Sequence, residues 1–241
     1  MENTVEANDK NIKTKLSIPE HLGKKVPLHW QQFMDDAQAE LAHVTSRIYD
    51  GGVSKGLKHG QGHLIMPSGE IFKGHWKNDQ RHGSGVCKFP NGAIYKGEWR
   101  EGRPQGQGIL FSPPNEIVEA RFDGWRVQDG MVKVLFSNGE FYEGNMKDGR
   151  REMNGVMHYR NGDIYEGEWV NDKRAGKRGK ITQPNTAKLT GQFTKDQADG
   201  SVEYEDKEGN VFITEADSQP AGDASMPQKK PMSARRTLKQ Q

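Results

Sequence analysis

Apolar and polar positions recur along most of this chain with a period of 23 residues. One copy spans residues 72–94. It begins with aromatic-x-Gly-x-aromatic, continues through a polar turn and Gly-x-Gly, and closes with a short apolar run and Asn-Gly. The next copy starts directly at Tyr95. A fixed period of 20–50 residues is the signature of a repeat architecture, so the chain is predicted to be an array of tandem units.

Seven units can be counted between residues 48 and 212. Their first positions fall at Tyr49, Phe72, Tyr95, Val118 or Glu119, Tyr142, Tyr165 and Leu189. The steps are 23 residues, except for single insertions in the fourth and sixth units. The pattern is weakest at residues 118–122, 152–153 and 175–178, and we expect a local twist or a loop there.

Strand alternation gives the structure of one unit. Positions one, three and five of a strand share a face, so the aromatic, the glycine and the second aromatic point the same way, while residues such as Lys73 and His75 point to solvent. The later apolar run is a second short strand, and Asn-Gly supplies the positive φ angles of a tight turn. Each unit is therefore a predicted β-hairpin. The fold is predicted to be all-β, an elongated single-layer antiparallel sheet of about fourteen strands.

The two ends of the chain differ from the array. Residues 1–27 are polar and are predicted to be a disordered arm. Residues 28–47 are predicted to form an amphipathic helix, because apolar residues recur at spacings of three and four. Phe212 is expected to start one more half-unit, and residues 213–241 are predicted to be a disordered tail, basic from 226.

The helix has two interpretations. We favour a cap that covers the open edge of the first repeat, since terminal repeats need a cover. The alternative is that it docks into a partner. Its docking candidates are then Trp30, Phe33, Met34 and Leu41.

At the level of motifs, Tyr142-Glu143-Gly144, the run 165–169 and the run 81–85 resemble MORN (membrane occupation and recognition nexus) repeats. The resemblance covers about residues 48–212, and a register held over seven units makes it specific. Proteins that consist almost only of these repeats are similar to the radial spoke head and other axonemal or cytoskeletal MORN proteins. The resemblance therefore implies a structural component of the cytoskeleton, located in the cytoplasm and in the axoneme of a cilium or flagellum.

Composition agrees with a cytosolic protein. The single Cys87 excludes an internal disulfide framework and fits a reducing compartment. No apolar run approaches the ~18 residues needed to span a bilayer, and the N-terminus has no signal-peptide core. The net charge of +2 argues neither for nor against nucleic acid, and we expect none as a partner.

No motif points to catalysis. The Gly-x-Gly pairs lack the strand–helix context of a phosphate loop. His59 and His82 share one repeat position, but they have no ligand partners at metal spacing and belong to a turn. Cys87 has no basic neighbours at helix spacing, so it is interpreted as a packed residue. We expect no enzymatic activity, no cofactor and no metal site.

Three functions remain open. The first is a scaffold whose aromatic row binds other proteins of a multi-subunit cytoskeletal complex, a neighbouring helix being the natural filler. Its groove candidates are Phe72, Trp76, Tyr95, Trp99, Tyr142, Tyr165 and Trp169. An exposed sheet edge could also pair two copies as a homodimer.

The second function is a phosphoinositide or membrane adaptor with weak anionic-lipid binding. Its basic candidates are Lys173, Arg174, Lys177 and Arg178 in the cluster 173–180, and Lys229, Lys230, Arg235 and Arg236 in the tail. A net charge of −4 over residues 28–225 argues against the repeats binding a membrane alone. The third function, a regulatory subunit of an enzyme, rests on family analogy only.

Overall fold

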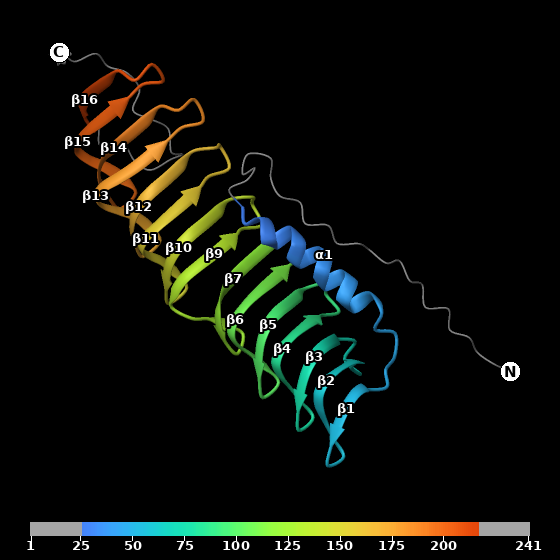
Figure 1. The fold of residues 1–241 in the computed structure, drawn as a ribbon. Coiled ribbons are helices and arrows are strands. Elements are labelled where there is room, and N and C mark those ends of the chain that lie inside the picture. Colours follow the sequence, from blue (N-terminus) through green and yellow to red (C-terminus); the bar gives the residue numbers. More distant parts are fainter. Residues whose placement is uncertain (1–25, 217–241) are drawn as a thin grey trace, which may run out of the picture.

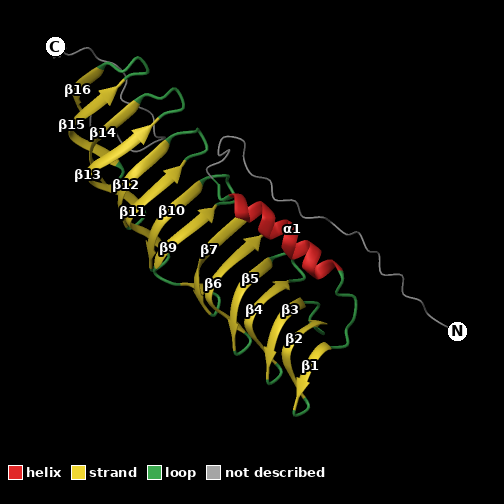
Figure 2. Cartoon of the chain, viewed as in Figure 1, coloured by secondary structure: helices red, strands yellow, loops and turns green. Residues whose placement is uncertain are grey.

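The computed structural model describes residues 26–216 and arranges the repeats as one open antiparallel sheet, crossed by a single helix (Figures 1 and 2). The strands of the first three units are β1 (Asp50–Ser54), β2 (Leu57–Ile65), β3 (Ile71–Lys77), β4 (Gln80–Lys88), β5 (Ile94–Arg100) and β6 (Arg103–Ser112). The fourth and fifth units contain β7 (Glu116–Asp123), β8 (Arg126–Val127), β9 (Gly130–Leu135), β10 (Phe141–Lys147) and β11 (Arg150–His158). The remaining strands are β12 (Ile164–Val170), β13 (Lys173–Thr182), β14 (Lys188–Thr194), β15 (Gln197–Glu205) and β16 (Val211–Glu215).

Each strand pairs with its sequence neighbours, so the sheet is a succession of hairpins. The path runs from β1 to β16 in chain order, with only the two-residue β8 outside it, paired to β7. Seven hairpins are followed by the half-unit β16, which confirms the predicted all-β single-layer fold. The short β8 lies in the fourth unit, where a loop was expected.

Six of the seven hairpins carry a bulge next to a central glycine, the exception being β7–β9. Between the pairs Gly74↔Gly85 and His75↔His82, one step along β3 faces three steps along β4. In the sixth unit, two steps along β12 face five along β13. That bulge therefore holds one residue more, and this is where the insertion predicted from the sequence lies. Bulges bend and twist a strand, in keeping with the coiled sheet in Figure 1.

Two apolar cores lie on opposite faces of the sheet. The first, on the face we call the aromatic face, contains the aromatic residues of repeat positions one and five. The phase predicted from alternation is confirmed, since Phe72, Gly74 and Trp76 are buried while the residues between them are partly exposed.

The second core lies under α1 (Leu28–Ala42), and it corrects the interpretation of the helix. The helix runs across the face opposite the aromatic rows (Figure 1). It packs on residues from β2 to β10, such as Ile71, Phe111 and Phe141, whereas all of the edge strand β1 is exposed. The expected cap over the edge of the first repeat is therefore wrong. The docking candidates Trp30, Phe33, Met34 and Leu41 are all buried in this contact, at most 5% exposed.

The reason for this placement is an apolar residue directly before the first position of the second to fifth units. Ile71, Ile94, Ile117 and Phe141 occupy this position and point to the helix face by strand alternation. Polar contacts fix the helix at both ends: Trp30 Nε1 donates to Glu119 Oε2 at 2.7 Å, and Lys96 Nζ lies 2.6 Å from Glu40 Oε1.

Beyond the helix, the same face becomes charged. Lys180 pairs with Glu166 and Lys188 pairs with Glu205 across neighbouring strands. The apolar position before the first residue of a unit persists at Ile164, one unit beyond the helix, and ends at Lys188.

The boundaries differ slightly from those expected. The helix ends at Ala42 rather than at 47, and β16 extends the array to Glu215, past the expected boundary at 212. Lys229, Lys230, Arg235 and Arg236 lie outside the described residues, as do most of the arm and the tail. Within residues 26–216, no helix has the length and apolar character needed to cross a membrane.

Candidate partner-binding face

Aromatic rings pack edge to face along the aromatic face. Phe72 contacts Trp76 at 5.2 Å and Trp99 at 5.3 Å between ring centroids, with interplanar angles above 80°. Tyr142, Tyr165 and Trp169 repeat the arrangement in the fifth and sixth units. Edge-to-face pairs are the preferred geometry of aromatic rings, each worth about 0.5–1.5 kcal/mol beyond area burial. Each ring thus joins its own unit to a neighbouring one.

Hydrogen bonds hold the polar atoms of these rings in the same way in unit after unit. The Tyr95 hydroxyl donates to the carbonyl of Glu98, three residues on, at 3.1 Å. Trp99 Nε1 donates to the Gly85 carbonyl of the preceding hairpin at 3.0 Å. Burial raises the pKa of the Tyr142 and Tyr165 hydroxyls to about 12. The tyrosines are therefore neutral structural donors at physiological pH.

The seven groove candidates are the core of the sheet. Phe72, Trp76, Tyr95, Trp99, Tyr142, Tyr165 and Trp169 are at most 5% exposed. In the isolated chain their rings are therefore not the surface that a partner would meet. That surface is formed by side chains lying over the rings.

A ladder of cations lies over the rings at one repeat position. Arg81 stacks on Trp99 with its guanidinium carbon 4.5 Å from the ring centroid, and Arg151 stacks on Trp169 at 4.2 Å. Lys58 and Arg174 occupy the same position in the first and sixth units. A cation over an aromatic face contributes about 0.5–1 kcal/mol at exposed sites and more when desolvated. We call these four residues the cation ladder.

Three of the four cations are locked to the turn of the next hairpin, whereas Arg81 pairs with Glu70 at 2.9 Å. Asp172 Oδ1 accepts from the Arg151 backbone N–H at 2.9 Å and from Arg151 Nε at 3.1 Å. In return, the Asp172 N–H donates to the Arg151 carbonyl. Asp79 with Lys58 and Asp196 with Arg174 make equivalent contacts. The carboxylates thus neutralise the ladder and join adjacent hairpins.

The ladder is interrupted in the middle of the array, where Pro104 stands at the cation position. Here the β7–β8 turn places Trp125 against Tyr95 and Trp99, at 5.8 and 6.0 Å between ring centroids. Trp125 is nevertheless 50% exposed. It also meets Phe89 edge to face at 5.4 Å. An exposed indole on top of a rigid aromatic core is typical of an interface anchor.

A second row flanks the ladder at the start of the turns that join successive units. Its members are half-buried, recur at one repeat position in four units and pack against the aromatic core: Met66, Phe89, Phe136 and Tyr159. The aromatic face therefore presents, from β2 to β11, an apolar row beside a cation row with one exposed tryptophan between the cations. We call this surface the groove face.

The family profile matches the same periodicity. The MORN repeat family matches residues 49–71, 72–94, 95–115, 142–164 and 165–177. These are the first, second, third, fifth and part of the sixth hairpins. This chain is a MORN repeat protein. The structure adds two hairpins that the profile does not match, β7–β9 and β14–β15.

Other comparisons say little about the MORN array. No curated protein sequence gave a match. Among solved structures, the TCP domain of Drosophila melanogaster SAS-4, in complex with a proline-rich motif of Ana2, is 16% identical and aligns over 64% of this chain and 83% of that chain, with a TM-score of 0.42. The TCP10 domain of Danio rerio CPAP is 14% identical over 71% of this chain and 91% of that chain, with a TM-score of 0.25. Similarities this low support no argument about function.

The basic cluster of the MORN array is only partly free. Arg174 is stacked on Tyr165 and Phe193 and paired with Asp196, and Lys180 is paired with Glu166. Lys173, Lys177 and Arg178 are exposed.

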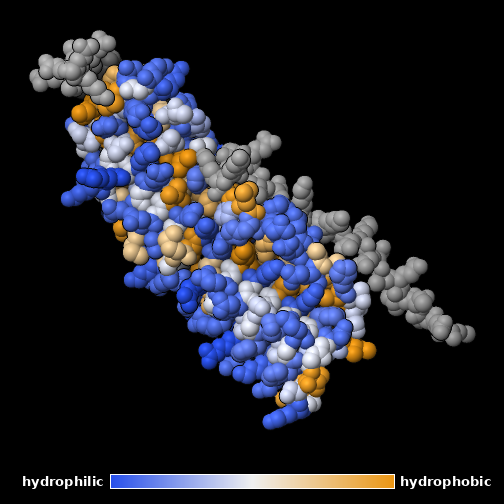
Figure 3. Space-filling model, in the orientation of Figure 1, coloured by the Kyte–Doolittle hydropathy of each residue, from blue (hydrophilic) through white to orange (hydrophobic). Residues whose placement is uncertain are grey.

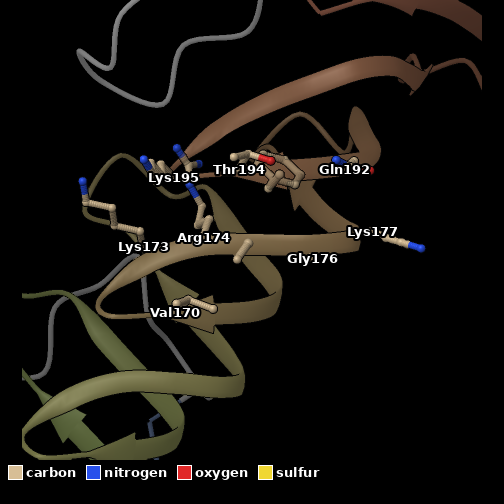
Figure 4. Close-up of a pocket in the computed structure, with 10 residues that line it drawn as sticks. Val170, Lys173, Arg174, Gly176, Lys177, Gln192, Thr194 and Lys195 are labelled. Carbon is tan, nitrogen blue, oxygen red and sulfur yellow. The ribbon is translucent and has the colours of Figure 1, made fainter.

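Lys173 and Lys177 line a hollow of about 340 Å³ between the sixth and seventh hairpins. In Figure 4, Lys177 points away from Lys173, Arg174 and Lys195. The cluster thus does not converge on one point.

The histidines lie at the surface, and the cysteine is a packed residue. His59, His75 and His82 line a second hollow, and His75 contacts Gln61 and Ser84. In the part of the chain that the structure describes, no group of three or more His, Cys, Asp and Glu residues could hold a metal ion. Cys87 is fully buried, and burial raises the pKa of its thiol to about 12.

The cation ladder and its aspartates were missed in reading the sequence for partner sites. The signal was present, because a Lys or Arg recurs at 58, 81, 151 and 174 and an Asp at 79, 172 and 196. Trp125 was missed because it lies in the unit that departs from the period.

Proposed function

We propose that this MORN array is a non-catalytic scaffold that holds a partner segment along the groove face. The observation that carries the proposal is the exposed Trp125 on a rigid aromatic core, between two stretches of the cation ladder. The opposite face is covered by α1 over the first five units. One face is therefore available along the whole length of the array.

The partner chemistry follows from this surface. A segment with apolar residues toward Met66, Phe89 and Trp125 would remove apolar area from water, which contributes about 25 cal/mol per Å². The cations are already paired with carboxylates. They therefore position polar groups of the partner more than they attract the partner by charge. An amphipathic helix is the natural occupant of such a surface.

The proposed setting is an axoneme. The resemblance to the radial spoke head and other axonemal MORN proteins supports a structural component of a ciliary or flagellar complex. The protein should then be extracted with axonemal proteins rather than with membranes. Recovery only with membranes, released by detergent and not by salt, would overturn the setting.

The groove itself is tested by affinity purification with Trp125→Ala. This variant should lose the axonemal partners that the unaltered chain recovers. Val170→Ala is the matched control, since Val170 is also 50% exposed but, as the neighbour of Trp169 in the strand, points to the other face. Equal recovery by both variants would place the partner elsewhere.

A further inference from the structure

Exposed apolar side chains cluster at the two ends of the array, while others, such as Met153 and Val170, lie singly along it. At the first end, Ile48, Val53 and Leu57 are 79%, 63% and 40% exposed. At the last end, Val211, Phe212 and Ile213 are 56%, 43% and 78% exposed. Both end strands, β1 and β16, are exposed along their whole length. Each offers a row of backbone N–H and C=O groups to another strand.

The last strand is half of a repeat. Every earlier first strand of a unit is followed by a second strand that pairs with it, whereas β16 pairs only with β15 among the described strands. The sequence of 217–241 lacks the apolar run that marks second strands of the array. Natural edge strands are usually blunted by Pro, Lys or a bulge, and Val211–Glu215 contains none of them.

The two ends differ in charge. The first hairpin, residues 49–71, is neutral, with two Lys against one Asp and one Glu, and the second hairpin brings residues 49–94 to a net charge of +3. Residues 188–216 contain three Lys and seven Asp and Glu, a net charge of −4. Complementary charge steers association and fixes which surfaces meet.

We propose that the array assembles head to tail, with the β1 end of a second copy seated on the β16 end of the first. The contact buries Ile48, Val53 and Leu57 of one copy near Phe212 and Ile213 of the other, and it brings the basic first two hairpins toward the acidic end. A tail-to-tail pair would instead bring two ends of charge −4 together.

The geometry fixes the form of this assembly. Strand direction alternates along the path, so β1 and β16 run in the same direction, and copies stacked with the same face up pair these strands in parallel. Parallel pairs are only slightly less stable per residue than antiparallel pairs. The contact joins two different surfaces, so it is heterologous and forms open rows rather than closed dimers. It leaves the groove face of every copy free, so it does not rest on the proposed partner.

The test uses two variants of the full chain, Val53→Lys at the head and Ile213→Lys at the tail. Both side chains are more than 60% exposed, so thermal unfolding should be unchanged. In sedimentation velocity, the unaltered chain should form species larger than a dimer as concentration rises, and added salt should dissolve them. Each variant alone should be monomeric.

The decisive sample is an equimolar mixture of the two variants. Val53→Lys keeps an intact tail and Ile213→Lys keeps an intact head, so the mixture should form dimers and nothing larger. A chain that is monomeric at all concentrations would overturn the proposal. Loss of association in Ile213→Lys alone, with Val53→Lys still forming dimers, would overturn it in favour of tail-to-tail pairing. Neither variant alters Trp125, so partner capture by the monomeric variants reports separately on the groove.

Discussion

Glycine at the third repeat position is explained by what a Cβ would meet. A Cβ on Gly97 would lie within 2.7 Å of the Tyr95 hydroxyl, the Gln107 carbonyl and the Gly108 Cα. Gly74 and Gly144 have the same kind of surroundings. The tyrosine ring therefore lies flat over two glycines of adjacent strands, and this close approach requires that both lack a side chain.

Gly97→Val should lower the free energy of unfolding by more than 3 kcal/mol, because neither backbone nor ring can move away from the new side chain. Glu98→Val is the neighbouring control. It loses a hydrogen bond from the Gln107 N–H and should cost about 1 kcal/mol. Urea unfolding followed by tryptophan fluorescence measures both. Equal losses would mean that the strand phase is wrong.

At the same scale, the row of buried tyrosines makes stability sensitive to alkali. Burial raises the pKa of Tyr142 and Tyr165 to about 12, and it raises the pKa of Tyr95 as well. Above pH 10 the unfolded chain loses these protons while the folded chain keeps them. The folded state should therefore lose about 1.4 kcal/mol per tyrosine for each pH unit between 10 and 12.

Urea unfolding at pH 9, 10 and 11 checks this dependence. Tyr142→Phe removes one titrating group, so its stability should fall less steeply between pH 10 and 11 than that of the unaltered chain. An identical slope for both chains would show that Tyr142 does not contribute.

Between elements, the array is joined by recurring contacts from one hairpin to the next. Asp172→Ala removes the acceptor of two Arg151 hydrogen bonds and leaves a partly buried guanidinium without its charge partner. It should cost about 1–3 kcal/mol. Asp148→Ala, at an exposed turn position with the same left-handed backbone (φ 50°, against 67° at Asp172), carries that backbone cost without losing an arginine contact, and should cost only about 1 kcal/mol. Thermal unfolding of the two variants compares them directly, and similar losses would contradict the role given to Asp172.

The helix contact is tested at the same scale. Trp30→Ala removes the largest fully buried side chain, which lies between α1 and the sheet. It should lower the free energy of unfolding by about 3–5 kcal/mol. Gln32→Ala, two residues further on and exposed, should be nearly neutral. A small loss in Trp30→Ala, with α1 exchanging amide hydrogens no faster, would mean that the helix is held elsewhere.

Sequence periodicity predicted the strands well. Within each strand the side chains alternate between the two faces, and the repeat of 23 residues shows the same alternation in unit after unit, so only one assignment of residues to faces is consistent. Periodicity also located the extra residue of the sixth hairpin and the irregular fourth unit. The helix was placed wrongly because its row of apolar residues predicts only that one side of the helix is buried. It does not predict which surface of the sheet buries that side. The deciding residues were in the sheet, where Ile71, Ile94, Ile117 and Phe141 recur on the helix face. The sequence identified the aromatic rows correctly as one face of the sheet. It did not predict that the rings are buried, because their burial depends on side chains that lie over them, such as Arg81 and Arg151, and strand alternation says only which face a residue is on.

Over the whole molecule, the apolar cores on the two faces of the sheet differ in how many units they span. The aromatic core runs from the first hairpin to the last, whereas the core under α1 stops at β10. Partner binding and assembly therefore belong to different parts of the surface: the groove face along the array, and the strand edges at its ends.

The helix has one more consequence, for how the array comes apart. In a linear array each repeat is stabilised mainly by its neighbours, but α1 contacts strands of the first five units at once. Those units should unfold as one cooperative block. No helix packs across the sixth and seventh hairpins. The array should therefore unfold first at its C-terminal end, and the amide hydrogens of β13–β16 should exchange first.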